Sequence, residues 1–177
     1  VETAAQMDSE KGVRMMVVGA DVNGDREMDR VKQLAKERDL EDKIEFVGQV
    51  DHRDLPLYYN AADVCVVPSY YESFGLVALE SMACGTPVIA SRVGGLPAVV
   101  KHGLTGYLLP RRCPEPFADT LDMVLLNRDL RDCMSEAALE LAGTMGWDKI
   151  ASRIQDLYRS CIESFRCTIQ NEFRSIV

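Results

Sequence analysis

The sequence has no excess of positive charge. Among its 177 residues, 20 lysines and arginines are outnumbered by 28 aspartates and glutamates, which gives a net charge of -8. Nonspecific binding to nucleic acids or to anionic membranes needs a basic surface, because cationic side chains neutralise phosphates and release their counterions. The composition therefore predicts no nucleic-acid partner, although it still allows a local basic pocket.

The sequence also lacks a paired cysteine motif. Its cysteines are scattered, with no C-x-x-C pair and no histidine at metal-ligand spacing beside them. We interpret them as free thiols of a cytoplasmic protein and expect no bound metal, with a disulfide between Cys161 and Cys167 left open. The six positions are Cys65, Cys84, Cys113, Cys133, Cys161 and Cys167.

Long hydrophobic runs are absent as well. No apolar stretch approaches the roughly 20 residues of a membrane-spanning helix, and no secretory signal is recognisable. Apolar residues nevertheless make up 47% of the chain, enough for one domain with a substantial core. The sequence predicts a soluble, cytoplasmic, single-domain protein.

Short apolar runs rich in β-branched residues recur through the first 110 residues, a pattern typical of parallel strands buried on both faces. Amphipathic segments alternate with them, which predicts an α/β fold with a doubly wound, Rossmann-like parallel sheet. From 111 to 177 the pattern predicts only helices, over 114–127, over 128–143 and from Trp147 onward. The strand candidates are RMMVVGA, IEFVGQV, VCVVPSY, PVIASRV and GYLLP.

Both ends of the chain look unfinished. Residues 1–12 read as the end of a helix, so a preceding strand is expected to be missing and the chain to be part of a larger protein. The last helix carries an apolar stripe that continues almost to the C-terminus, and such a face predicts a partner surface. The stripe consists of Trp147, Ile150, Ile154, Leu157, Tyr158, Cys161, Phe165, Ile169, Phe173 and Ile176.

The segment YESFGLVALE places two carboxylates, Glu72 and Glu80, seven mostly apolar residues apart at a strand-to-helix junction. A helix that begins near Gly75 presents free backbone N–H groups suited to a phosphate. Carboxylates accept hydrogen bonds from vicinal hydroxyls, so the pair around a phosphate site suggests a nucleotide sugar. Spacing alone leaves it equally open that Glu72 is a solvated loop residue and Glu80 the polar edge of a packing helix. The N–H groups are those of Phe74, Gly75, Leu76 and Val77.

The stretch PSYYESFGLVALESMACGTPVIASRVGGLPAVVKHGLTGYLLP resembles the signature region of the retaining family 4 (group 1) glycosyltransferases, which have the two-domain GT-B architecture. The resemblance extends from Met15 to the GWDKIASRIQDLY helix and keeps the E-x7-E spacing. Within the group it is most similar to inositol-phosphate N-acetylglucosaminyltransferases and sucrose-phosphate synthases. It implies the C-terminal, donor-binding half of a GT-B enzyme that moves a hexose-type sugar from a nucleotide diphosphate to an acceptor hydroxyl.

The resemblance also implies a role for each site residue, with the nucleotide sugar as substrate and no cofactor or metal. Glu72 contacts donor-sugar hydroxyls near the reacting carbon, and Glu80 binds the ribose. The FGLV amides hold the diphosphate, and the loop around Val50 meets the base through its backbone. The leaving diphosphate helps deprotonate the acceptor.

One departure from the family pattern matters. The family neutralises the donor diphosphate with an arginine and a lysine upstream of the MMVVGA strand, and nothing upstream of Met15 matches them. No lysine or arginine occurs between Arg53 and Arg92 either. A diphosphate beside carboxylates without a cation is unfavourable, so we expect an incomplete donor site and an inactive fragment.

The missing acceptor domain is a further expected partner. The family's C-terminal helix crosses back onto the N-terminal domain, which would account for the apolar stripe and predicts self-association of the fragment. Peripheral membrane association of the intact enzyme stays open. So do two alternative functions, a nucleotide-sugar 2-epimerase and a non-catalytic nucleotide-binding module.

Three further motifs give weaker indications of function. DVNGD resembles the opening of a calcium loop, but Lys32 stands where the bidentate glutamate is needed, which favours a plain βα turn. His52 and His102 have no evident partners, although His52 follows the expected base-binding loop. Gly94-Gly95 marks a tight turn that either lines the sugar pocket or is purely structural.

Overall fold

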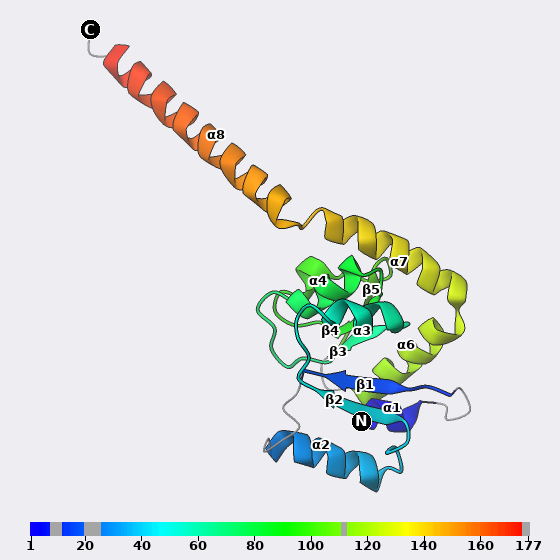
Figure 1. The fold of residues 1–177 in the computed structure, drawn as a ribbon. Coiled ribbons are helices and arrows are strands. Elements are labelled where there is room, and N and C mark those ends of the chain that lie inside the picture. The colour runs from blue at the N-terminus through cyan, green and yellow to red at the C-terminus, as the bar shows by residue number, and fades with distance from the viewer. Residues whose placement is uncertain (8–11, 20–25, 111–112, 175–177) are drawn as a thin grey trace.

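The computed structural model describes residues 1–7, 12–19, 26–110 and 113–174, and it contains the strands and helices predicted within these ranges (Figure 1). The βα turn predicted at 21–25 lies outside the described residues. The strands are β1 (Met15–Val18), β2 (Ile44–Gly48), β3 (Cys65–Val67), β4 (Val88–Ser91) and β5 (Gly106–Leu109). The helices are α1 (Glu2–Gln6), α2 (Arg26–Glu37), α3 (Leu55–Ala61), α4 (Leu76–Ala83), α5 (Leu96–Val99), α6 (Pro114–Leu126), α7 (Arg128–Gly143) and α8 (Trp147–Arg174).

The sheet β3–β4–β5 is parallel and is covered on both faces. Alternate side chains of a strand point to opposite faces, and all four residues of β4 are buried. Val88 and Ala90 pack in a core cluster with Met82 of α4. Ile89, between them, packs in a second cluster with Phe117 of α6. This arrangement explains why the strand reads as a continuous apolar run and confirms the doubly wound α/β fold.

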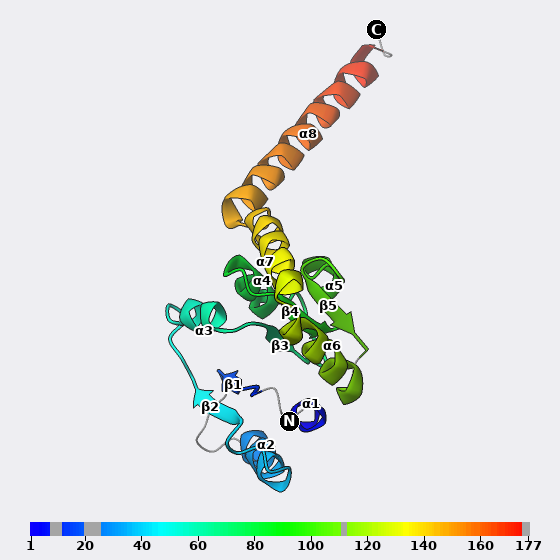
Figure 2. The same cartoon turned by 90° about the vertical axis from the view of Figure 1, so that its right-hand side faces the viewer.

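The other two strands form a separate parallel pair, in which Met15 lies opposite Ile44. No hydrogen bond joins β1 to β3 in the described part of the chain, so the predicted sheet consists of two hydrogen-bonded parts. Figures 1 and 2 place β1, rather than β2, on the side toward β3. The sequence pattern showed which segments are strands but not this interruption between them.

The N-terminal segment contains the helix predicted there, and α1 bridges the two parts of the sheet. Val1 and Ala4 pack against the β1–β2 cluster, whereas Met7, directly after α1, is buried in the cluster beneath α6. Helix α1 and the residues at its two ends therefore help to hold the β1–β2 pair against the remainder of the fold.

The helical part begins with α6 and α7, whose junction is well defined by polar contacts. Asn127 caps α7, because its side chain accepts a hydrogen bond from the Leu130 N–H at 3.0 Å. Arg131 donates to the Val124 carbonyl at 3.0 Å and forms an ion pair with Asp63 at 3.5 Å. The α6–α7 corner is thereby tied to the residues that precede β3.

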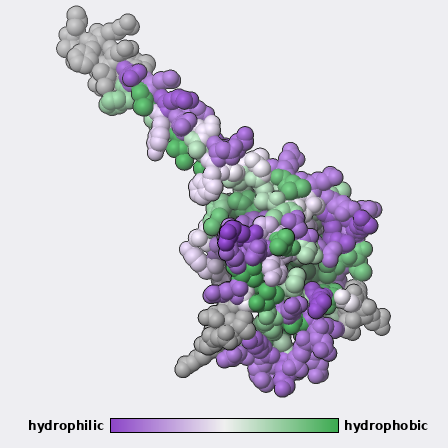
Figure 3. Space-filling view, viewed as in Figure 1, coloured by the Kyte–Doolittle hydropathy of each residue, from purple (hydrophilic) through white to green (hydrophobic). Residues whose placement is uncertain are grey.

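Helix α8 projects away from the body of the molecule (Figure 1). From Ile154 to Phe165 its apolar stripe is exposed, with Leu157 60% and Phe165 67% exposed, whereas Ile150 is half-buried. Figure 3 shows hydrophobic residues along this helix as well as on the body. The side chains of Ile169 and Phe173, and all of residue 176, lie outside the description.

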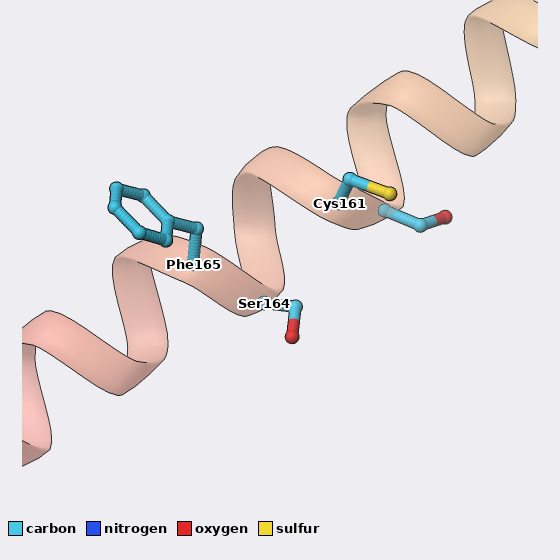
Figure 4. Close-up of a pocket in the computed structure, with 4 residues that line it drawn as sticks. Cys161, Ser164 and Phe165 are labelled. Atoms are coloured by element: carbon cyan, nitrogen blue, oxygen red, sulfur yellow. The ribbon is translucent and has the colours of Figure 1, made fainter.

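A hollow on α8 is lined by four residues of this one helix, Ser160, Cys161, Ser164 and Phe165. Figure 4 shows no second element facing them, so the hollow is an open helix surface and not an enclosed site. Cys161 is a free thiol. A disulfide with Cys167 does not fit, because six residues along one helix separate two Cα atoms by about 9 Å and a disulfide needs less than about 7 Å.

The exposed stripe leads to a prediction for the isolated chain. We expect its apparent mass in light scattering to rise with concentration, because burial of the α8 stripe between copies removes apolar surface from water. Leu157→Glu should reduce the rise, whereas Gln155→Glu, which adds the same charge at another exposed position of α8, should not. A monomer at all concentrations would contradict the expectation.

None of the described helices combines the length and the apolar character that crossing a lipid bilayer requires.

Candidate functional site

The candidate site lies where β3 leads into α4, at the carboxyl end of a parallel strand, the usual place for ligands in this class of sheet. Gly75 precedes the first residue of α4 and has a φ of 103°, a left-handed conformation that glycine adopts at little cost. By their position in the first turn, the N–H groups of Leu76 and Val77 have no acceptor within the helix. Phe74, Leu76 and Val77 are 44%, 58% and 46% exposed, so the N-terminus of α4 opens to solvent.

The loop that carries Glu72 is held by Gly94 and Gly95. The Gly95 N–H donates to the Glu72 carbonyl at 2.9 Å. A Cβ on Gly94 would lie 1.8 Å from the same carbonyl oxygen, and one on Gly95 would lie 2.5 Å from the carbonyl oxygen of Ser73. Of the two interpretations of this Gly-Gly turn, the structure supports the close packing of backbone on backbone. The turn fixes the loop in which Glu72 lies.

The Glu72 carboxylate points to the N-terminus of α4. Its Oε1 accepts a hydrogen bond from the Gly75 N–H at 3.1 Å. One of the amides predicted to hold a phosphate is therefore bonded to a carboxylate of the same loop. The sequence interpretation missed this contact, although a glutamate three residues before the N-cap of a helix has the reach to accept from the N–H of the N-cap residue.

Glu80 lies on the second turn of α4, and its side chain is 32% exposed. Its two oxygens have different partners: Oε2 accepts from the Tyr59 hydroxyl at 3.1 Å, and Oε1 lies 3.3 Å from Nε2 of His52. Burial, and after it the negative charge of Glu80, raises the pKa of Tyr59 well above its usual range. The phenol therefore remains a hydrogen-bond donor at neutral pH and above.

His52 also connects the loop after β2 with α4. Val50 follows β2 by two residues, and His52 is two residues further along the chain. The contact with Glu80 thus brings the loop predicted to meet the base next to the carboxylate predicted to meet the ribose. The other histidine has a structural place, because Nδ1 of His102 accepts the Leu108 N–H at 3.1 Å.

The charged side chains nearest to the start of α4 are acidic. Two carboxylates lie beside the start of α4, and no lysine or arginine occurs between Arg53 and Arg92. Arg53 itself is paired with Asp51 at 3.0 Å, which lowers the pKa of that carboxyl. Within the described residues, no three His, Cys, Asp or Glu side chains gather closely enough to hold a metal ion.

Comparison with known proteins gives the family. Residues 1–141 match the family model described as Glycosyl transferases group 1. The chain belongs to this family. A curated member of similar sequence, D-inositol 3-phosphate glycosyltransferase of Saccharomonospora viridis, is 40% identical over 171 residues, which are 94% of this chain and 40% of the relative. This group 1 glycosyltransferase chain thus spans about two fifths of the length of that relative.

Solved structures of the family share the fold. Sucrose-phosphate synthase from Thermosynechococcus elongatus superposes with a TM-score of 0.79 at 39% identity, over 92% of this chain and 42% of the synthase. The C-terminal domain of a group 1 glycosyltransferase from Francisella tularensis gives a TM-score of 0.72 at 30% identity, over 81% of this chain and 75% of that domain. The predicted resemblance and the predicted fold, the C-terminal half of a GT-B glycosyltransferase, are confirmed.

Proposed function

We propose that this chain is the donor-binding half of a retaining glycosyltransferase, which transfers a hexose-type sugar from a nucleoside diphosphate to an acceptor hydroxyl. The observation that carries the proposal is the placement of both glutamates of the E-x7-E pair at one helix. Glu72 lies at the exposed N-terminus of α4, and Glu80 is held one turn further along by residues of α3 and of the loop after β2. Family membership of the chain supports the same function.

In this proposal each part of the site binds a different part of the nucleotide sugar. Glu80, an acceptor with a partly exposed carboxylate, binds the ribose hydroxyls. The N–H groups of Phe74, Leu76 and Val77 hold the diphosphate with the help of the helix dipole, and that of Gly75 can join them only when it leaves Glu72. Glu72 contacts the donor sugar, and the backbone around Val50 meets the base.

The division of the sheet into two parts supports a further part of the proposal, a strand contributed by another segment of the protein. β1 is paired on one side by β2, and β3 is paired on one side by β4, while no bond links β1 to β3. One additional parallel strand from another part of the protein would make the sheet continuous. The segment from Asp54 to Ser91, which contains α4, has no lysine or arginine, so we expect that other part of the protein to supply a cation for the diphosphate as well. The acceptor would bind to a separate domain.

The direct test is calorimetric titration of the 177-residue chain with UDP, GDP and ADP. We expect one of them to bind weakly, with a dissociation constant on the order of 1 mM, because the amides and Glu80 are present while the cation is not. The corresponding nucleotide sugar should bind to the same site and compete. Failure of all three nucleotides to bind at several millimolar would contradict the proposal.

A change at Glu72 separates its role from that of Glu80. In Glu72→Ala the Gly75 N–H becomes free and a negative charge leaves the start of α4. We therefore expect the affinity for a bare nucleoside diphosphate to rise roughly five-fold, in line with one hydrogen bond of about 1 kcal/mol. The preference for the nucleotide sugar over the bare nucleotide should disappear. Calorimetry with both ligands measures this difference.

Glu72→Gln serves as the control for charge, because it keeps the length of the side chain and an acceptor oxygen. It should raise the affinity for the bare nucleotide less than Glu72→Ala does. Equal losses of affinity for both ligands in Glu72→Ala would show that Glu72 does not discriminate the sugar.

A further inference from the structure

The Glu80 carboxylate is held in place by a closed set of hydrogen bonds. The Tyr59 hydroxyl donates to Oε2 of Glu80 at 3.1 Å, from α3 to α4. The backbone carbonyl of the same tyrosine accepts from Oγ1 of Thr86 at 2.6 Å. The Thr86 carbonyl accepts from the hydroxyl of Ser81, the neighbour of Glu80, at 2.9 Å. The path thus leaves α4 at Glu80 and returns to it at Ser81.

The members of this path differ in burial. Ser81 and Thr86 are 0% and 3% exposed, so their hydrogen bonds are not exchanged for water. Tyr59 is half-buried between them and the site, and Glu80 is the partly exposed end of the path. A buried polar network of this kind fixes its members, and here it fixes the backbone of Tyr59, from which the phenol reaches the Glu80 carboxylate.

We propose that Tyr59 is a positioning residue of the donor site, whose hydroxyl fixes the Glu80 carboxylate in the orientation in which it accepts hydrogen bonds from the two ribose hydroxyls. The inference rests on the proposed function and deepens it by assigning a residue that acts through Glu80.

The stereochemistry of a carboxylate explains why such a residue is needed. A glutamate side chain rotates about three bonds, and ordering it on ligand binding costs up to about 2 kcal/mol. Each carboxylate oxygen has two acceptor positions, so a bond from Tyr59 occupies one of four and leaves acceptors for a diol. An ionised carboxylate only accepts hydrogen bonds, so a group that orients Glu80 must be a donor. The phenol of Tyr59 stays protonated and provides this donor without adding a charge.

His52 is the other neighbour of Glu80, but its position differs. Its side chain is 82% exposed and lies in a loop, whereas the backbone carbonyl of Tyr59 is fixed by Thr86 and also accepts the Ala62 N–H at 3.1 Å. Tyr59 is therefore the partner that determines the orientation of Glu80 before a ligand arrives.

The experiment compares two ligands that differ only in the ribose. UDP and 2′,3′-dideoxy-UDP, or the pair with whichever base binds, are titrated into the unaltered chain and into Tyr59→Phe. The unaltered chain should prefer the ribonucleotide by roughly 10-fold, the value of about one hydrogen bond to a charged group. In Tyr59→Phe this preference should fall to about 2-fold, while the affinity for the dideoxy ligand stays unchanged.

Tyr58→Phe is the matched control. Tyr58 is the preceding residue of α3 and is also half-buried, but its hydroxyl makes no hydrogen bond within the described residues. This variant should keep the full ribose preference. Thermal unfolding of both variants checks that neither has lost its fold.

A double-mutant cycle with Glu80→Gln tests whether Tyr59 acts through Glu80. The loss of ribose preference in the double variant should equal that of Glu80→Gln alone, because the tyrosine then has no carboxylate to orient. Additive losses would overturn the inference, as would a full ribose preference in Tyr59→Phe while the unaltered chain binds normally. If the unaltered chain binds no nucleotide at all, the proposed function fails and this inference fails with it.

Discussion

Replacing Glu80 with alanine should lower the affinity of the chain for its nucleoside diphosphate by roughly 30-fold, the largest effect on binding that we expect from a single side chain. A carboxylate that accepts hydrogen bonds from both ribose hydroxyls contributes about 1.5–3 kcal/mol for each bond to a charged group. Part of that is offset because the unliganded carboxylate is hydrated, with its side chain 32% exposed. A net loss of about 2 kcal/mol corresponds to the 30-fold change. Ligand-observed NMR measures it, because a 30-fold loss from about 1 mM is too weak for calorimetry.

The fold should tolerate this change. Glu80 is 32% exposed, and its removal frees the hydroxyl of the half-buried Tyr59 and the side chain of the exposed His52. We expect the free energy of unfolding to change by less than about 1 kcal/mol, as for a partly exposed hydrogen bond. Chemical denaturation of the variant therefore separates lost binding from lost structure.

Glu140→Ala is a suitable control for charge. Glu140 is an exposed glutamate on α7 without a hydrogen bond or ion pair in the described part of the chain, so its replacement changes the net charge equally. If binding depends on Glu80 only through the overall charge, both variants will bind alike. If Glu80→Ala binds as the unaltered chain does, Glu80 does not contact the ribose and the proposed arrangement of the donor is wrong.

The fold could be predicted from the sequence because its strands are buried on both faces. VIAS reads as a strand, since Val88 and Ala90 pack toward α4 while Ile89 packs toward α6. The three helices after Pro110 begin where they were expected, and α6 and α7 end within one residue of their expected limits. The interruption between β1 and β3 could not, because a strand's own pattern records burial and not which strand lies beside it.

The site was predictable only in part. The E-x7-E spacing indicated which two carboxylates lie at α4, but the bond from the Gly75 N–H to Glu72 depends on a loop path that Gly94 and Gly95 set from elsewhere in the chain. Tyr59 escaped notice because it is one of two adjacent tyrosines in an ordinary amphipathic helix. The rotation of α3 relative to α4 decides which of the two tyrosines points toward Glu80, and a sequence pattern does not record it.

The Gly-Gly turn gives the second large effect, this time on stability. Gly94→Ala should lower the free energy of unfolding by about 2–4 kcal/mol, within the range of severe single substitutions. Gly94 has a φ of 50°, where a residue with a side chain loses about 1 kcal/mol. The greater part comes from the new Cβ, which would lie 1.8 Å from the Glu72 carbonyl oxygen. A backbone carbonyl cannot move aside as easily as the end of a flexible side chain. The loop from Glu72 to Gly75 must therefore shift as a whole.

Gly103→Ala separates the two causes. Gly103 also has a left-handed conformation, with a φ of 78°, but a Cβ there would meet nothing within 4 Å. The free energy of unfolding of Gly103→Ala should fall only by the conformational contribution, about 1 kcal/mol, and this variant should still bind the nucleotide. For Gly94→Ala we expect the melting temperature to fall by about 6–12 °C, and nucleotide binding to fall below detection even at temperatures where the variant is folded. Equal losses of stability in both variants would show that the loop accommodates a side chain, and that Gly94 does not determine where Glu72 lies.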